Sequence, residues 1–435
     1  MLLIYSPINT PRLQYICNFI FSFLEITFSI STRPDDVITH NGPIINYSSN
    51  QNLPGLHIYL SGLLQQEGIR KQDIKAGTHE NFPLIFSTEQ GKLPFDIFSA
   101  VFFLITRYEE YLPYTPDEYG RFHFKDSTAY KLGFLNRPLI NEWMIWFGSE
   151  LKKLYPQLQI SVPEFSFLPT YDIDMAWSYR QKGLLRNLGG MIKKPSAERI
   201  AVLANIIADP FDAYRWLHKL HEAHQLNPIY FFLVADKISR YDKNTSPSNS
   251  AFRNLIRQHH SHYTVGLHPS WQSNNNPRVF KQEADTLRGL INHTITASRQ
   301  HYIKMQMPET YRMLIENEIT NDYSMGYGSI NGFRASVARP FKWYDLKKEK
   351  VQPLHIHPFC FMDANSYYEQ QQTIEETEAE LQHYLKTCRE TGGELISIFH
   401  NSFLGSGKAF KGWRELYTDF VKQAVENGSK QDLKL

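Results

Sequence analysis

In the second half of the chain, short apolar runs alternate with polar segments of helical character. Seven runs of strand length follow Phe165, among them FSFLPTYD, PIYFFLVA, GSINGFRAS and ELISIFHN. Between them, residues 279–292, 308–317 and 373–390 have the composition and spacing of helices. Strands that alternate with helices predict parallel strands joined by crossovers, in a sheet or a barrel. This half has about 270 residues, close to the ~250 typical of a β/α barrel.

The first half has a different pattern, in which short strands mix with helices. LLIY, EITFSI and GLHIYL predict strands, and Thr10 followed by Pro11 predicts the start of a helix. FDIFSAVFFLITRYEEYL predicts a second helix with Asp96 as its cap, and RPLINEWMIWFGSELKKLY predicts a third. PQLQISVPE then has the character of a linker. We therefore expect a smaller α+β domain over residues 1–160 and a β/α-barrel domain over residues 165–435.

Composition and charge exclude several classes of protein. Hydrophobic residues make up 42% and charged residues 21%, an ordinary globular balance. The 46 basic and 44 acidic residues leave a formal net charge of +2, which argues against a nucleic-acid groove built on bulk charge. Cys17, Cys360 and Cys388 are too few and too scattered for a disulfide framework or a cysteine-based zinc site.

The amino-terminal residues do not have the pattern of a targeting segment. They lack a basic stretch and a small-residue cleavage site, and Pro7, Pro11 and Arg12 interrupt the apolar residues. No stretch of 18 uninterrupted apolar residues occurs anywhere in the sequence. We therefore expect no signal peptide, no membrane span and a cytoplasmic location.

Acid–base and ligand-type residues stand at the carboxyl ends of the predicted strands, where parallel β/α folds place their chemistry. In chain order they are Asp172 and Asp174, His268, Arg299 and His301, Arg334, His357 and Asp363, and His400. Carboxylates and imidazoles together suit a borderline divalent cation such as zinc. Such a cation would bind one aspartate and leave the other free as a base, with an arginine to keep it ionised. A histidine on the far side could then protonate a leaving amine.

The strings around these residues resemble the motifs of the NodB-type polysaccharide deacetylases, carbohydrate esterase family 4. TYDID is similar to that family's Thr-aromatic-Asp-Asp motif, with one residue inserted between the acids, and GLHPSWQ is similar to its His-Ser/Thr-x-x-His motif. NGFRAS is similar to the motif whose arginine holds the base, and LISIFHN to the strand that ends in the acid histidine. Members of the family are deformed β/α barrels, so the resemblance implies an α/β fold of this kind.

The resemblance implies a catalytic role for four of the matching residues. Asp172 would be the base, and Arg334 would hold it in its ionised form. His400 would be the acid, and Asp363, in FCFMDAN, is the candidate for the aspartate that tunes it.

The implied metal ligands are Asp174 and His268, and the third ligand departs from the family. Gln272 stands where the family has its second histidine, and an amide is a poor zinc ligand. The nearest replacement is His301, in SRQHYIK at the next strand end. We expect one divalent metal ion, most simply zinc, on these three side chains.

The chain as a whole is similar to a variant group of these proteins in Bacteroidetes-type bacteria. TYDID, GLHPS, SRQHY, DYSMGY and GFRAS recur in that group, and IYSPINTPRLQYI is similar to the domain that accompanies it. The likeness extends over nearly the full length, and it specifies lineage more closely than activity.

The leading hypothesis is a metal-dependent hydrolase that removes acetyl groups from an N-acetylated sugar or glycan precursor. Further side chains could bind the sugar, namely Trp177, Trp271, Asp322 and His357. Gln272 motivates a second hypothesis, a barrel that has lost catalysis and binds a glycan or a protein partner. A third is the hydrolysis of an ester or a non-sugar amide on the same barrel. Each residue also has a plain structural interpretation as a cap, a buried ion pair or a packing group.

Overall fold

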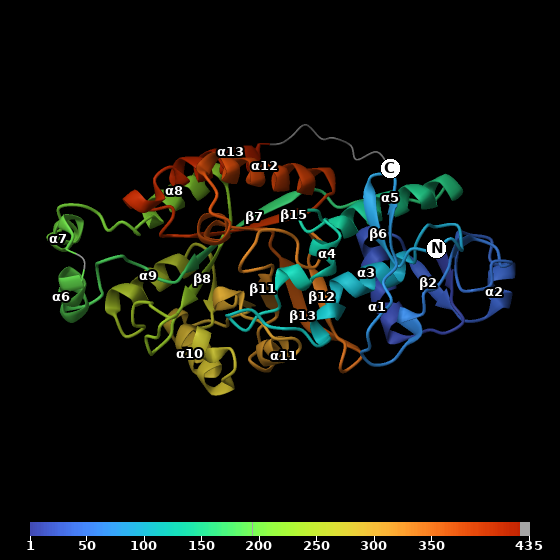
Figure 1. The fold of residues 1–435 in the computed structure, drawn as a ribbon, viewed down its shortest axis with the longest axis horizontal. Helices are drawn as coiled ribbons and strands as arrows, with labels where there is room; N and C mark the ends of the chain where they lie inside the picture. Colours follow the sequence, from blue (N-terminus) through green and yellow to red (C-terminus); the bar gives the residue numbers. More distant parts are fainter. Residues whose placement is uncertain (194, 427–435) are drawn as a thin grey trace.

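The computed structural model describes residues 1–193 and 195–426. In Figure 1 the blue N-terminal segments lie at one end of an elongated molecule, while the cyan segments reach its centre, where strands of the second half also lie. The α/β fold predicted from the sequence is confirmed, with an α+β region in front of a deformed, incomplete barrel.

The N-terminal part contains a parallel four-stranded sheet in the order β2-β1-β3-β4. Its strands are β1 (Leu2–Tyr5), β2 (Phe28–Ser31), β3 (Ile44–Tyr47) and β4 (Leu56–Ile58), and an antiparallel hairpin follows as β5 (Ala76–His79) and β6 (Phe82–Ile85). The α-helices are α1 (Pro11–Phe23), α2 (Pro34–Thr39), α3 (Ile97–Ile105), α4 (Thr128–Lys131) and α5 (Leu139–Leu154). Helix α3 is apolar on all sides and completely buried, as a core helix must be.

Two helix starts predicted from the sequence have the expected capping bonds. The Thr10 hydroxyl accepts the N–H of Leu13 at the start of α1, where Pro11 is the first helical residue. The Asp96 carboxylate accepts the N–H of Ser99 at the start of α3. Local sequence therefore determines where both helices begin.

The C-terminal part contains a nine-stranded sheet in the order β12-β13-β11-β10-β9-β8-β7-β15-β14. Its strands are β7 (Ser166–Ile173), β8 (Ile229–Leu233), β9 (Thr264–His268), β10 (Ala297–Ser298), β11 (Asn321–Met325), β12 (Phe341–Asp345), β13 (Lys350–Pro358), β14 (Phe361–Met362) and β15 (Glu394–His400). All neighbours are parallel except β12 and β13. Strands β12 and β14 stand at the two edges and do not pair with each other, so the barrel is open.

Helices lie on two opposite sides of the C-terminal part. They are α6 (Leu184–Lys193), α7 (Ala197–Leu203), α8 (Tyr214–His224), α9 (Ser250–His260), α10 (Pro277–Ile291), α11 (Glu309–Glu316), α12 (Ile374–Glu390) and α13 (Trp413–Val425). In Figure 1, α8, α12 and α13 lie along one side, and α9, α10 and α11 along the other. Among the described residues, no helix has both the length and the apolar character needed to cross a bilayer.

One predicted strand is wrong. GSINGFRAS forms a series of turns between β11 and β12 instead of a strand. Gly332 has a φ of +139°, and a Cβ there would lie 2.7 Å from the carbonyl oxygen of Leu135. This segment therefore passes too close to the N-terminal part, in too unusual a conformation, to continue a sheet.

The two parts share one hydrophobic core. A single cluster of buried side chains extends from Leu2 to Ala424 and includes residues of both parts. At their boundary the ring centroid of Tyr344 lies 4.9 Å from that of Tyr15 and 5.4 Å from that of Phe102. The N-terminal part is thus packed against the barrel and is not tethered by a linker alone.

Candidate active site

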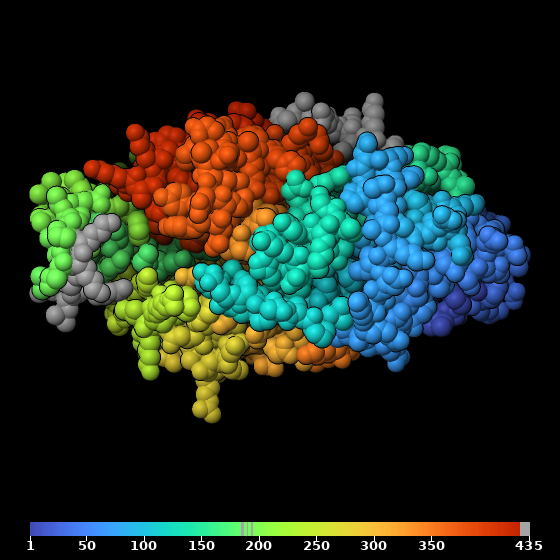
Figure 2. Space-filling view, viewed as in Figure 1, coloured from blue at the N-terminus to red at the C-terminus, as the bar shows by residue number. Residues whose placement is uncertain are grey.

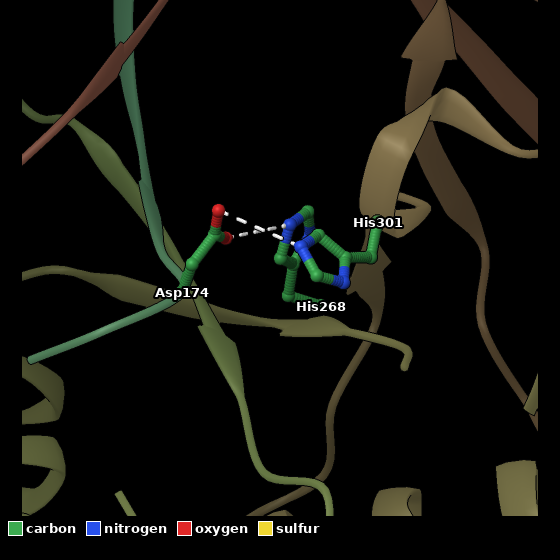
Figure 3. Close-up of side chains that lie close together, drawn as sticks. All are labelled: Asp174, His268 and His301. Atoms are coloured by element: carbon green, nitrogen blue, oxygen red, sulfur yellow. Dashed lines mark ion pairs between the residues drawn. The ribbon is translucent and has the colours of Figure 1, made fainter. Parts of the chain in front are cut away.

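Three predicted ligands converge at the carboxyl ends of β7, β9 and β10. Asp174 follows β7, His268 ends β9, and His301 comes three residues after β10. One potential ligand atom from each lies within 4.8 Å of the others, and Figure 3 shows the two imidazoles pointing at the carboxylate. His268 Nε2 is 3.2 Å from Asp174 Oδ1, and His301 Nε2 is 3.5 Å from Asp174 Oδ2.

The chemistry of this triad fits a divalent metal ion. Asp174 Oδ1 is buried and has no hydrogen-bond donor in the described structure, which is unusual for a carboxylate oxygen. Burial opposes a charge on Asp174, but the neighbouring His301 and His268 hold its pKa well below the usual range. An ionised carboxylate with two imidazole nitrogens is a typical three-residue set for catalytic zinc.

In each imidazole, Nδ1 lies within hydrogen-bond distance of an oxygen atom, and Nε2 faces Asp174. His268 Nδ1 lies 2.6 Å from the backbone oxygen of Arg299. His301 Nδ1 lies 3.1 Å from Oδ1 of the fully buried Asp242. Such partners fix the tautomer and the ring orientation of a metal-ligating histidine.

Gln272, which stands where the similar deacetylase motif has its second histidine, contacts the partner of His301, Asp242. Its amide donates to Asp242 Oδ2 at 3.3 Å and to the Lys237 oxygen at 3.1 Å. Asp242 also accepts the N–H of Trp271 at 2.8 Å. Gln272 thus supports the carboxylate that orients His301. The sequence analysis did not identify Asp242, because it lies in a polar loop whose only signal is a single aspartate.

The arginine that forms an ion pair with Asp172 is Arg299, whereas the sequence analysis expected Arg334. Arg299 is fully buried, and its Nη1 donates to Asp172 Oδ1 at 2.9 Å. Arg334 instead donates to both carboxylate oxygens of Glu110, and its Nη1 donates to the Gly326 oxygen. The turn that carries Arg334 faces the N-terminal part, which accounts for the difference.

His400 and Asp363 form a second carboxylate–imidazole pair beside the triad. His400 Nδ1 lies 2.6 Å from Asp363 Oδ1, and its Nε2 lies 3.7 Å from Asp174 Oδ2. Burial alone would lower the pKa of His400, but the negative charge of Asp363 and then that of Asp174 raise it to about 10. A histidine whose pKa is raised in this way is a candidate proton donor.

The four residues predicted to bind substrate do not share one surface. Trp177 is buried, with its ring edge-on to Phe252 at 6.5 Å, and Asp322 is fully buried. His357 lies 3.9 Å from the carboxylate of Glu394, which begins β15, whereas His400 ends that strand.

Trp271 lies near the triad. Its ring stacks on Tyr241 at 4.1 Å, and the Lys304 ammonium lies 3.8 Å from its centre. Its backbone N–H donates to Asp242, the carboxylate that contacts His301, so Trp271 is linked to the triad through this aspartate.

Residues 2–156 match a protein family of unknown function, DUF7033. No curated protein matches the chain. Solved structures that match include a polysaccharide deacetylase-like protein from Mycobacterium smegmatis, at 12% identity and a TM-score of 0.41, over 61% of this chain and 85% of the other.

Two further solved structures come from Bacillus species. The polysaccharide deacetylase Bc1974 from Bacillus cereus matches at 10% identity and a TM-score of 0.30, over 59% of this chain and 87% of its own. The pseudoenzyme BA3943 from Bacillus anthracis, of family CE4, matches at 7% identity and a TM-score of 0.33, over 61% of this chain and 62% of its own. These scores are too low to assign a function, which has to be inferred from the site.

Helix α10 carries a buried acid, Glu283, that has a pH-dependent effect on stability. Glu283 of α10 accepts the N–H of Ser270, and burial raises its pKa from 4.5 to about 7. Between these values the folded protein binds more protons than the unfolded chain, so this group lowers stability as the pH rises. Glu283→Gln keeps an acceptor and removes the charge. Between pH 4.5 and 8, we expect the free energy of unfolding of the variant to rise by about 2–3 kcal/mol relative to that of the wild type.

Urea unfolding of both proteins across this pH range measures the difference in free energy of unfolding. Glu318→Gln is the matched control, because the Glu318 side chain is 85% exposed. Parallel pH curves for the wild type and Glu283→Gln would contradict the prediction.

Proposed function

We propose that the protein is a metal-dependent hydrolase that removes the acetyl group from an N-acetylated sugar or glycan precursor. One observation carries the proposal: an arginine-held aspartate and a carboxylate-held histidine flank a single Asp–His–His group. A base, a metal group and an acid within reach of one another are what amide hydrolysis requires. The likeness of TYDID and LISIFHN to deacetylase motifs supports the N-acetyl substrate class.

Asp174, His268 and His301 would hold the metal ion. A divalent cation held by these residues would supply Lewis-acid activation of water and of the acetyl carbonyl. Two imidazoles and one carboxylate favour zinc over magnesium or calcium, which prefer oxygen ligands.

Two side chains would move protons during the reaction. Asp172 takes a proton from the attacking water, whose oxygen bonds to the carbonyl carbon, and Arg299 holds this carboxylate in place through its hydrogen bond to Oδ1. His400 gives its proton to the amide nitrogen as the C–N bond breaks, and Asp363 holds the ring in place. The products are acetate and the free amine. Asp172 and His400 face each other in register on neighbouring strands β7 and β15, consistent with a concerted action on one substrate.

Release of acetate tests the proposal. The full chain is stripped with a chelator, reloaded with Zn²⁺ and offered N-acetylhexosamine oligomers and lipid-linked and nucleotide-linked N-acetyl sugars. We expect acetate only in the metal-loaded reactions. His400→Ala should retain the metal and lose about 10²–10⁴-fold in rate, since it removes the proton donor. No acetate from the metal-loaded wild type on the whole panel would contradict the proposal.

A barrel that has lost catalysis is the second candidate, motivated by Gln272 in the family's histidine position, and ester hydrolysis on the same barrel is the third. The same groups would cleave an acetyl ester, and a barrel without catalysis would bind the glycan intact. Adding acetylated xylan to the panel and measuring glycan binding by calorimetry separates these outcomes. Binding with no acetate from any substrate would favour the non-catalytic barrel.

A further inference from the structure

A hairpin of the N-terminal part lies against the turn that carries His301. It comprises residues 116–122, closed by a bridge between Pro116 and Phe122. The Asp117 carboxylate accepts the N–H groups of Tyr119 at 3.0 Å and Arg121 at 2.8 Å, which organises the hairpin from within. Figure 2 shows this cyan segment between the blue N-terminal part and the yellow and orange C-terminal part.

Arg121 joins this hairpin to the turn after His301. Its Nε donates to Asp117 Oδ2 at 2.8 Å, and its Nη1 donates to the backbone oxygen of Tyr302 at 2.8 Å. The guanidinium also lies 4.6 Å from the ring centre of Tyr119. Only 6% of the Arg121 side chain is exposed, so its position is determined by these three partners.

The turn that Arg121 contacts has an unfavourable backbone. Tyr302 and Ile303, directly after His301, have φ values of 59° and 52°, in the left-handed region that bulky residues avoid. Each such residue costs of the order of 1–3 kcal/mol and persists only where the surroundings impose it. The ring of Tyr119 stacks on that of Tyr302 at 5.5 Å and adds a second restraint from the N-terminal part.

A third segment leaves room for this contact. A Cβ on Gly328 would lie 2.2 Å from Arg121 Nη1 and 2.8 Å from the Tyr302 oxygen. Such distances are sterically forbidden, so the bond between Arg121 and Tyr302 requires a glycine at this position. Segments 116–122, 301–303 and the loop after β11 are thus fitted to one another around a single guanidinium.

We propose that Arg121 is a positioning residue for the metal ligands, and that the N-terminal part thereby completes the active site. Arg121 fixes the turn at Tyr302 and so sets His301 opposite Asp174. The inference rests on the metal group of the proposed function and gives a role to part of the region 2–156, which matches a family of unknown function.

Binding of Co²⁺, which reports its ligands through its visible spectrum, tests the inference on the full chain. We expect Arg121→Gln to weaken Co²⁺ binding about 10–100-fold, the usual effect of losing a group that orients a ligand. Arg137→Gln is the matched control, because Arg137 also pairs with a carboxylate, that of Glu142, and donates to a backbone oxygen in the N-terminal part. Similar metal-free unfolding midpoints in the two variants, with weaker binding in Arg121→Gln alone, would support positioning.

Gly328→Ala approaches the same contact from the other side. It should also weaken Co²⁺ binding, whereas Gly289→Ala on α10, where a Cβ meets nothing within 4 Å, should not. Wild-type affinity in both Arg121→Gln and Gly328→Ala would overturn the inference and leave the proposed hydrolase intact. Weakened binding in both, with no acetate from the wild type, would uphold the inference and overturn the hydrolase. A wild type that binds no Co²⁺ would overturn the inference together with the metal group.

Discussion

Asp172→Asn is expected to lower the rate of acetate release by about 10²–10⁴-fold while the bound metal stays at the wild-type level. Asp172 Oδ1 is occupied by the guanidinium of Arg299, and its Oδ2 lies 3.8 Å from His268 Nε2. The asparagine retains the shape of the side chain but cannot accept a proton from water. The measurement is acetate release by the zinc-loaded variant, together with its zinc content.

Asp174→Asn is the matched variant, because it makes the same chemical change two residues away. Asp174 faces both imidazoles of the triad, so its loss should remove the metal and the activity together. The opposite pattern, with metal lost in Asp172→Asn and retained in Asp174→Asn, would exchange the roles of base and ligand. The pair of variants therefore assigns the two acids of TYDID without reference to any other protein.

The sequence was sufficient to predict the features that depend on position along parallel strands. Asp172, Asp174, His268 and His400 stand at or just beyond the ends of neighbouring strands, and their convergence follows from the register of β15, β7, β8 and β9. His301 could be proposed as the replacement ligand because it follows the next strand end in the chain.

The partners of these groups could not be predicted in the same way. Arg334 binds a carboxylate 224 residues away, that of Glu110, and no local pattern connects the two. Asp242 reaches His301 from a loop without periodicity. The hairpin at Arg121 contacts the site only because the N-terminal part packs onto the barrel. Long-range pairings of this kind depend on the tertiary fold, whereas strand ends are apparent in the sequence.

Glu110→Ala removes an ion pair between the two parts, with Arg334, and is expected to lower the free energy of unfolding. The Glu110 side chain is 3% exposed and accepts from Arg107 Nε at 2.7 Å and from Arg334 Nε at 2.8 Å. Its removal would leave two buried guanidinium groups without this carboxylate, which typically costs about 3–5 kcal/mol. Glu309→Ala is the control, since Glu309 is 60% exposed and its pair with Lys347 should contribute less than about 1 kcal/mol. Urea unfolding at pH 7 measures both.

The pH dependence of this effect distinguishes a lost charge from a lost packing contact. Burial would raise the pKa of Glu110, but Arg334 and Arg107 lower it from 4.5 to about 2. The stabilisation is therefore fully present above about pH 5 and is lost as the pH falls toward 2. The difference in free energy of unfolding between the wild type and Glu110→Gln should shrink over the same range. A difference that stays constant from pH 7 to pH 3 would show that the carboxylate acts through its shape, and that its charge does not hold the N-terminal part on the barrel.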